Sequence, residues 1–118
     1  MSKVVVIDFD NTIAKSKNVF PETGEPYDGV KDALQKLRDD GFTIKIHSCR
    51  TSKDFCWRPS EKAMHLHKMS QFMQEHEIPY DEIIDIMDKP MADFYIDDRA
   101  IGFRGDWKET IREMEQML

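Results

Sequence analysis

A run of β-branched residues near the N-terminus constrains the fold more than any other feature of the chain. Residues 3–9 read KVVVIDF, and the carboxylates Asp8 and Asp10 stand at the end of this run. A strand covered on one face alternates apolar and polar side chains, whereas a continuous apolar run is typical of a central strand covered on both faces. The run therefore predicts an α/β protein whose first strand ends in two acids.

Three helices are expected along the rest of the chain. Apolar residues recur at i, i+3, i+4 and i+7 from Val30, which predicts a helix between Asp28, a suitable N-cap, and Gly41, a usual C-terminal stop. Two further helices are expected to begin at the capping residues Ser60 and Asp106. All three patterns leave one face of each helix apolar, as packing on a sheet requires.

Strand patterns lie between these helices, at residues 42–48, 82–88 and 93–98. Strands that alternate with helices imply βαβ crossovers, so the chain is expected to form a Rossmann-like three-layer sandwich around a mostly parallel sheet. Its 118 residues suffice for one domain and are too few for two ordinary ones. We therefore expect a single domain over residues 1–118.

Composition restricts the function classes. The net charge of −6 argues against broad, non-specific binding to nucleic acid or membranes, although it leaves room for a local basic patch. No apolar stretch approaches the roughly 20 residues that cross a bilayer, and the N-terminus lacks the pattern of a signal peptide. The two cysteines, Cys49 and Cys56, form no C-x-x-C pair. These features predict a cytoplasmic protein with reduced thiols and no membrane partner.

Polar residues follow the predicted strands where ligands bind in parallel sheets, outside the carboxyl ends. Four strand ends bring four acids, one hydroxyl and one amine to the same edge. These residues are Asp8, Asp10, Ser48, Lys89, Asp97 and Asp98. Clustered carboxylates repel one another unless a cation joins them, and their hard oxygen atoms suit Mg²⁺. The edge therefore predicts a Mg²⁺ site that binds phosphate.

The chemistry of these residues fits a phosphate ester. A bound Mg²⁺ offsets the repulsion between Asp8 and a phosphate dianion. Ser48 and Lys89 offer donors for the phosphoryl oxygens, and Asp10, two residues beyond Asp8, is placed to move a proton. The alternative interpretation is that each acid merely lies in a solvated turn. That interpretation does not explain why acids follow several of the predicted strands.

The same residues resemble the four ordered motifs of the haloacid dehalogenase superfamily. Residues 8–12, DFDNT, resemble its first motif, D-x-D-x-T, and Ser48 after an apolar strand resembles the second. Lys89 resembles the third motif, and residues 95–98, YIDD, resemble the fourth. The resemblance covers most of the chain. It implies a phosphatase, a phosphoric monoester hydrolase, because members that act on carbon–halogen bonds lack the second acid, here Asp10.

The resemblance also implies roles. Asp8 would be the nucleophile that forms an aspartyl-phosphate, and Asp10 the general acid and then the base. Mg²⁺ would be held by Asp8, the main-chain carbonyl of Asp10 and an acid of the fourth motif, with Asp98 favoured over Asp97 and the choice left open. The expected phosphate-binding set is Ser48, Lys89, Cys49, Arg50 and Thr12, with Cys49 as a passive wall and Thr12 as a brace of the loop.

No cap domain is expected over this site. About fifteen residues separate Ile13 from the first helix, which is enough for a flap but not for a folded domain. An open site admits a large substrate or is covered by a neighbouring subunit, so a homo-oligomer that covers the site is one expectation. Asn11 stands where Gly is more usual in the first motif, and Asn tolerates left-handed backbone geometry.

Substrate class stays open at this point. Residues 48–52, SCRTS, with residues 96–99, IDDR, are similar to the 3′-phosphatase domain of phage-type polynucleotide kinase-phosphatases. That resemblance implies that Arg50 and Arg99 hold phosphate or position acids, and that the basic, aromatic loop at residues 50–58 stacks on a nucleotide. The other candidate is a sugar or metabolite phosphate. The rival function is a catalytically weak module with the same fold that binds a phosphate ligand or a protein.

Overall fold

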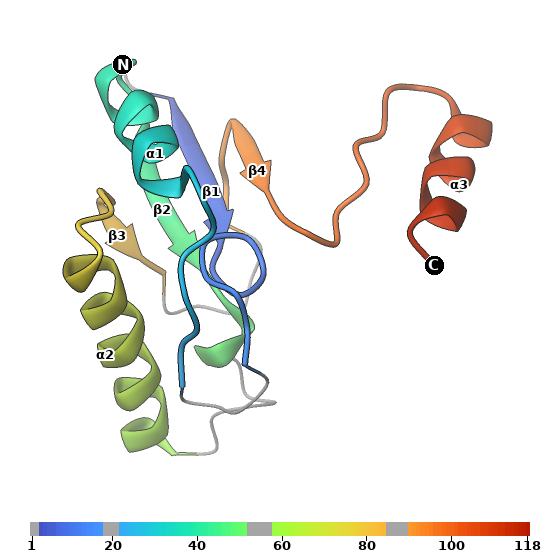
Figure 1. Ribbon diagram of the computed structural model, residues 1–118. Helices are drawn as coiled ribbons and strands as arrows, with labels where there is room; N and C mark the ends of the chain where they lie inside the picture. The colour runs from blue at the N-terminus through green and yellow to red at the C-terminus, as the bar shows by residue number, and fades with distance from the viewer. Residues whose placement is uncertain (1–2, 18–21, 52–57, 85–89) are drawn as a thin grey trace.

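A four-stranded parallel sheet forms the centre of the computed structural model, which describes residues 3–17, 22–51, 58–84 and 90–118. The strands run in the order β3-β2-β1-β4, and every pairing is parallel (Figure 1). The predicted α/β class with a parallel sheet of Rossmann-like type is therefore confirmed. The strands are β1 (Val4–Asp8), β2 (Thr43–His47), β3 (Glu82–Ile83) and β4 (Phe94–Ile96).

The helices follow the expected order, and their caps differ from prediction in two of three cases. They are α1 (Val30–Asp39), the short 3-10 helix η1 (Cys49–Thr51), α2 (Pro59–Glu75) and α3 (Trp107–Gln116). Asp28 does not cap α1, because left-handed Gly29 occupies the N-cap. Ser60 does not cap α2, because Pro59 already takes the first helical position. Asp106 caps α3 as predicted and accepts from the backbone N–H groups of Lys108 and Glu109.

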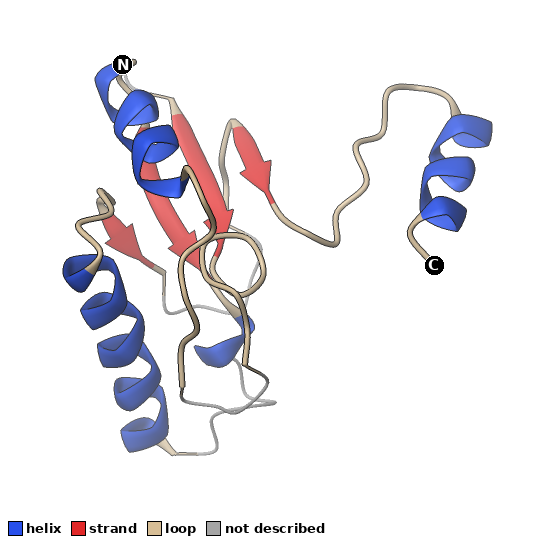
Figure 2. Cartoon of the chain, viewed as in Figure 1, coloured by secondary structure: helices blue, strands red, loops and turns tan. Residues whose placement is uncertain are grey.

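The hydrophobic core lies on one face of the sheet. Successive side chains of a strand point to opposite faces, and the register pairs Val5 with Ile44 and Ile7 with Ile46. All four side chains join one buried cluster with residues of both α1 and α2, which therefore cover the same face (Figure 2). The contributing helix residues are Leu34, Met69, Phe72 and Met73.

The opposite face of the sheet is covered by no helix in the part of the chain that the structure describes. It carries Val6 and Asp8 of β1, His47 of β2 and Tyr95 of β4, as the alternation and register require. In the predicted three-layer sandwich, α3 would belong on this face. Instead α3 stands away from the sheet, and none of its residues is buried (Figure 2).

The described segments that join β1 to α1 contain turns and isolated bridges but no helix or strand. A tight turn follows β1, in which Asn11 has a φ of 62° and its side chain accepts from the N–H of Ser16. Asn11 therefore adopts the left-handed conformation that the sequence allows. Beyond the turn, the two ends of the loop between β1 and α1 come together, in a closure where the N–H of Lys15 donates to the carbonyl of Glu25. No described helix is long and apolar enough to cross a membrane.

Gly24 is expected to be essential to this closure. A Cβ at residue 24 would lie 2.0 Å from the carbonyl oxygen of Lys15, a backbone atom that cannot rotate away. Gly24→Ala should therefore lower the free energy of unfolding by about 1–3 kcal/mol in urea titrations. The matched control is Gly102→Ala, where a Cβ meets nothing within 4 Å; its change should stay within about 0.5 kcal/mol. Equal effects of the two substitutions would contradict the close approach.

Candidate functional site

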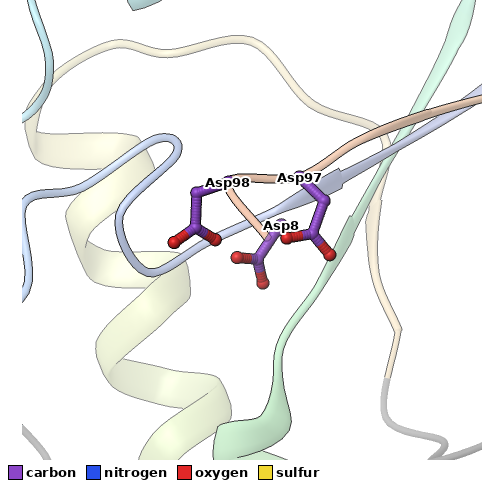
Figure 3. A group of neighbouring side chains, drawn as sticks. All are labelled: Asp8, Asp97 and Asp98. Atoms are coloured by element: carbon purple, nitrogen blue, oxygen red, sulfur yellow. The ribbon is translucent and has the colours of Figure 1, made fainter. Parts of the chain in front are cut away.

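Three acids meet where β1 and β4 end. Ile7 pairs with Ile96, so the next residues, Asp8 and Asp97, leave the sheet at the same level. One carboxylate oxygen of each of Asp8, Asp97 and Asp98 lies within 4.8 Å of the others. Figure 3 shows the three side chains gathered at the strand ends. The expected convergence of acids from the first and fourth strands is therefore found.

The surroundings of Asp8 raise its pKa from the usual 3.8 to about 7. Burial is the largest cause, followed by a hydrogen bond with Asp98 and the negative charges of Asp97, Asp98 and Asp10. Each cause disfavours the carboxylate form of Asp8, and a bound cation would offset the repulsion from the neighbouring negative charges. The donor set is made only of hard oxygen atoms, which fits Mg²⁺.

The raised pKa of Asp8 makes stability depend on pH in the absence of a divalent cation. The folded-state pKa lies above the unfolded value, so the native state holds a proton that the unfolded chain releases. This contribution is fully present below pH 3.8 and is lost as pH rises through about 7. We expect the free energy of unfolding to fall across that window and Mg²⁺ to restore it at the upper end.

Urea titrations at pH 5 and pH 8, each with and without MgCl₂, measure this effect. Asp98→Asn removes one charge and one candidate ligand, so it should weaken both the pH dependence and the response to Mg²⁺. An Asp98→Asn variant that gains as much stability from Mg²⁺ as the parent protein would contradict the placement of the cation among these acids.

Asp10 lies apart from the three acids, in an ion pair with Arg50. Nε of Arg50 donates to Oδ2 of Asp10 at 2.8 Å, and Nη2 donates to Oδ1 at 2.8 Å. Nη2 also donates to the carbonyl of Glu22 at 2.8 Å, and the guanidinium lies over the ring of Phe9. The Arg50 side chain is 1% exposed and that of Asp10 14%. This pair connects η1, after β2, to the turn after β1 and to the segment that leads to α1.

Two roles were expected for Arg50, to bind phosphate or to position an acid. The structure places its guanidinium on Asp10 and on the carbonyl of Glu22, which agrees with the second role. A signal was present, because β1 and β2 are parallel with Asp8 level with His47. A basic residue three positions beyond His47 thus falls near an acid two positions beyond Asp8. Direct contact of Arg50 with phosphate stays a prediction.

The remaining predicted phosphate ligands occupy different environments. Ser48 is buried, and its Oγ accepts from the N–H of Arg50 at 3.1 Å, which braces the turn after β2. Cys49 is exposed as a residue, but its thiol is partly desolvated. This desolvation, with the charges of Asp10 and Asp8, raises the pKa of the thiol, in line with a passive wall. Thr12 has a buried Oγ1 with no partner among the described residues. Contact of each with phosphate stays a prediction.

Part of the predicted site falls outside the described residues. Lys89, the expected amine at the phosphate, is one such residue, and Lys53, Phe55 and Trp57 of the basic, aromatic loop are others. At the end of that loop, Arg58 is exposed and immediately precedes α2. The backbone N–H of Arg99 donates to Asp97 at 2.9 Å and orients that carboxylate.

A hollow of about 940 Å³ opens beside the acids on the uncovered face of the sheet. Its lining combines polar with apolar residues. Asp8, His47 and Asp97 are among the polar ones, and Phe94, Tyr95 and Phe103 among the apolar ones. Among the described residues, the site is therefore an open depression rather than a closed pocket.

The chain matches no protein-family model and no curated protein. Its fold is similar to two solved structures. One is a conserved protein from Bacteroides thetaiotaomicron, with a TM-score of 0.64 and 19% identity over 100% of this chain and 93% of that one. The other is a protein from Vibrio cholerae, with a TM-score of 0.58 and 26% identity over 98% of this chain and 99% of that one. These similarities establish the fold.

Proposed function

We propose that the protein is a Mg²⁺-dependent phosphomonoester hydrolase that acts through an aspartyl-phosphate on Asp8. The observation that carries the proposal is the meeting of Asp8 with Asp97 and Asp98 at the carboxyl edge of a parallel sheet. Carboxylates so close together, one of them with its pKa raised to about 7, are costly unless a cation binds there. The resemblance of residues 8–12 and 95–98 to motifs of the haloacid dehalogenase superfamily supports the same function.

The proposed reaction has two steps. An oxygen of Asp8 attacks phosphorus, the bond from phosphorus to the leaving-group oxygen breaks, and that oxygen takes a proton. Water then attacks phosphorus, the bond to Asp8 breaks, and inorganic phosphate leaves. Mg²⁺, when bound by Asp8 and Asp98 or Asp97, supplies the positive charge that lets phosphate approach the carboxylates.

Asp10 is the proposed proton carrier, and Arg50 fixes its position. Both carboxylate oxygens of Asp10 accept hydrogen bonds from Arg50, yet each oxygen keeps a second lone pair. That arrangement suits acceptance of a proton from the attacking water in the second step. The same lone pair would hold the proton that Asp10 donates to the leaving group in the first step, so neither transfer requires Arg50 to give up a bond. The pair thus fixes the orientation of Asp10 in advance for both transfers.

Hydrolysis of an aryl phosphate with and without Mg²⁺ tests the proposal. We expect turnover that requires a divalent cation and that a chelator abolishes reversibly. Asp98→Asn should raise the Mg²⁺ concentration needed for half-maximal rate. Binding of phosphate without any metal-dependent turnover would instead support the rival reading, a binding module with this fold.

Two substrate classes remain candidates, a nucleotide or polynucleotide 3′-phosphate and a sugar or other metabolite phosphate. A 3′-phosphorylated oligonucleotide compared with a panel of metabolite phosphates separates them. The loop variant Lys53→Gln with Arg58→Gln leaves the Arg50–Asp10 pair intact. The nucleic-acid class would be supported if the parent protein prefers the oligonucleotide, the loop variant loses this preference, and the control variant Lys31→Gln on α1 keeps it. A loop variant with the same substrate preference as the parent protein would exclude a role of the loop in binding nucleic acid.

A further inference from the structure

The last helix has an apolar face that is exposed, with the Phe103 ring beside Trp107 at one end of it. Trp107, Ile111 and Met114 recur at helical spacing, and these residues are 69%, 43% and 44% exposed. A helix of ten residues is marginally stable in water on its own and gains most of its stability from packing an amphipathic face. The sequence of α3 is therefore that of a helix that packs on an apolar surface.

The sheet offers a surface of matching kind. The face opposite α1 and α2 is hollowed beside β4, where Val6 and Tyr95 contribute apolar lining, and residues 100–103 of the segment after β4 line the hollow as well. Acids stand in the same hollow, at Asp93 and Asp97. The side of α3 that carries Trp107 and Ile111 also carries Lys108, Arg112 and Glu115, and Arg112 pairs with Glu109 of the same helix. Helix and hollow thus match in apolar character, and Lys108 offers a positive charge to the acids of the hollow.

The junction before α3 directs the helix away from its own sheet. The arm formed by residues 99–106 runs outward from β4 (Figure 1). Its last turn is defined by Gly105, with a φ of 92°, by the Asp106 cap, and by Phe103, whose ring lies 4.9 Å from that of Trp107 between centroids. These local contacts fix the direction of α3 relative to the end of the arm.

We propose that two copies exchange their C-terminal arms, so that α3 of each copy packs on the open sheet face of the other. A reciprocal exchange is a closed, two-fold arrangement that uses the helix and the hollow of both copies and leaves neither free. It supplies the missing helix layer of the sandwich. Because the hollow reaches Asp8 and Asp97, α3 of the second copy also forms one side of the acid site. The inference does not depend on the proposed reaction.

The molar mass in solution, measured by light scattering during size exclusion, tests the exchange. We expect twice the chain mass of 13.9 kDa. Ile111→Lys places a charge on the apolar face and should give the chain mass alone. Glu113→Gln changes the net charge by the same amount two residues away and should stay dimeric. A wild-type protein that is monomeric at all concentrations, or an Ile111→Lys protein that remains dimeric, would overturn the proposal.

Trp107 provides a second readout that does not rely on a substitution in α3. In a Trp57→Phe background it is the sole tryptophan. The exchange predicts blue-shifted emission that moves to the red on dilution, as the dimer dissociates. Emission that is blue-shifted at every concentration means that α3 folds onto its own sheet, and emission that is always red-shifted means that α3 stays in water. Either result would overturn the exchange.

Discussion

Asp8→Asn should lower kcat for a phosphomonoester by about 10³-fold or more, because the amide cannot act as the nucleophile. The substitution keeps the size of the side chain, so binding of substrate should change far less than turnover. The matched control is Asp32→Asn, which removes the same charge from the exposed first turn of α1. It should retain the activity of the parent protein.

The stability of the Asp8→Asn variant provides an internal check on this result. Burial and the neighbouring acids disfavour ionised Asp8, so the amide should raise the free energy of unfolding of the metal-free protein above pH 7. Loss of activity together with a gain in stability is expected when a side chain is kept for chemistry rather than folding. An inactive variant that is also less stable would point to damage of the fold, and an active one would exclude Asp8 as the nucleophile.

Arg50→Met should lower the free energy of unfolding by about 3–5 kcal/mol, the usual cost of breaking a buried ion pair from one side. The substitution leaves Asp10, which is 14% exposed, without its guanidinium partner, and it strands the carbonyl of Glu22. Urea titration measures the loss. The control is Lys36→Met, which breaks an ion pair of 2.9 Å with Asp40 on the exposed side of α1. That change should cost far less, because solvent screens an exposed ion pair.

A double-mutant cycle assigns the cost to the pair. Asp10→Asn in the Arg50→Met background removes the unpaired charge, so the double variant should be more stable than the sum of the single changes predicts. We expect a coupling of about 1–3 kcal/mol, since the two side chains share two hydrogen bonds. Additive effects would show that Arg50 stabilises the fold through other contacts and does not hold Asp10.

The sequence predicted most of the fold and the acids of the site because both follow from local pattern. An uninterrupted apolar run predicts a central strand, and parallel strands bring their carboxyl ends to one edge of the sheet. The sequence alone therefore predicts that Asp8 and Asp97 lie close together, as they do. Cap residues were predicted less well. Asp28 and Ser60 are not the N-caps, because the left-handed backbone of Gly29 and the fixed φ of Pro59 decide where α1 and α2 begin.

Local pattern did not specify the partner of Arg50 or the position of α3, although the register of β1 and β2 brings Arg50 near Asp10. Arg50 sits in a basic, aromatic segment that reads as a surface loop, and only tertiary structure shows that its side chain is 1% exposed. The amphipathic pattern after Asp106 predicts a helix correctly, but it says nothing about which surface the apolar face meets. Both depend on contacts between residues far apart in the chain.

Phosphorylation of Asp8 is the central claim, and its most direct test is a rapid-quench reaction with an aryl phosphate labelled in the phosphoryl group. In the presence of Mg²⁺ we expect acid-precipitated protein to carry label as an acyl phosphate that hydroxylamine releases, and peptide mapping to place it on Asp8. The Asp8→Asn protein should carry none. Metal-dependent turnover without labelled protein, or label on a residue other than Asp8, would contradict the account.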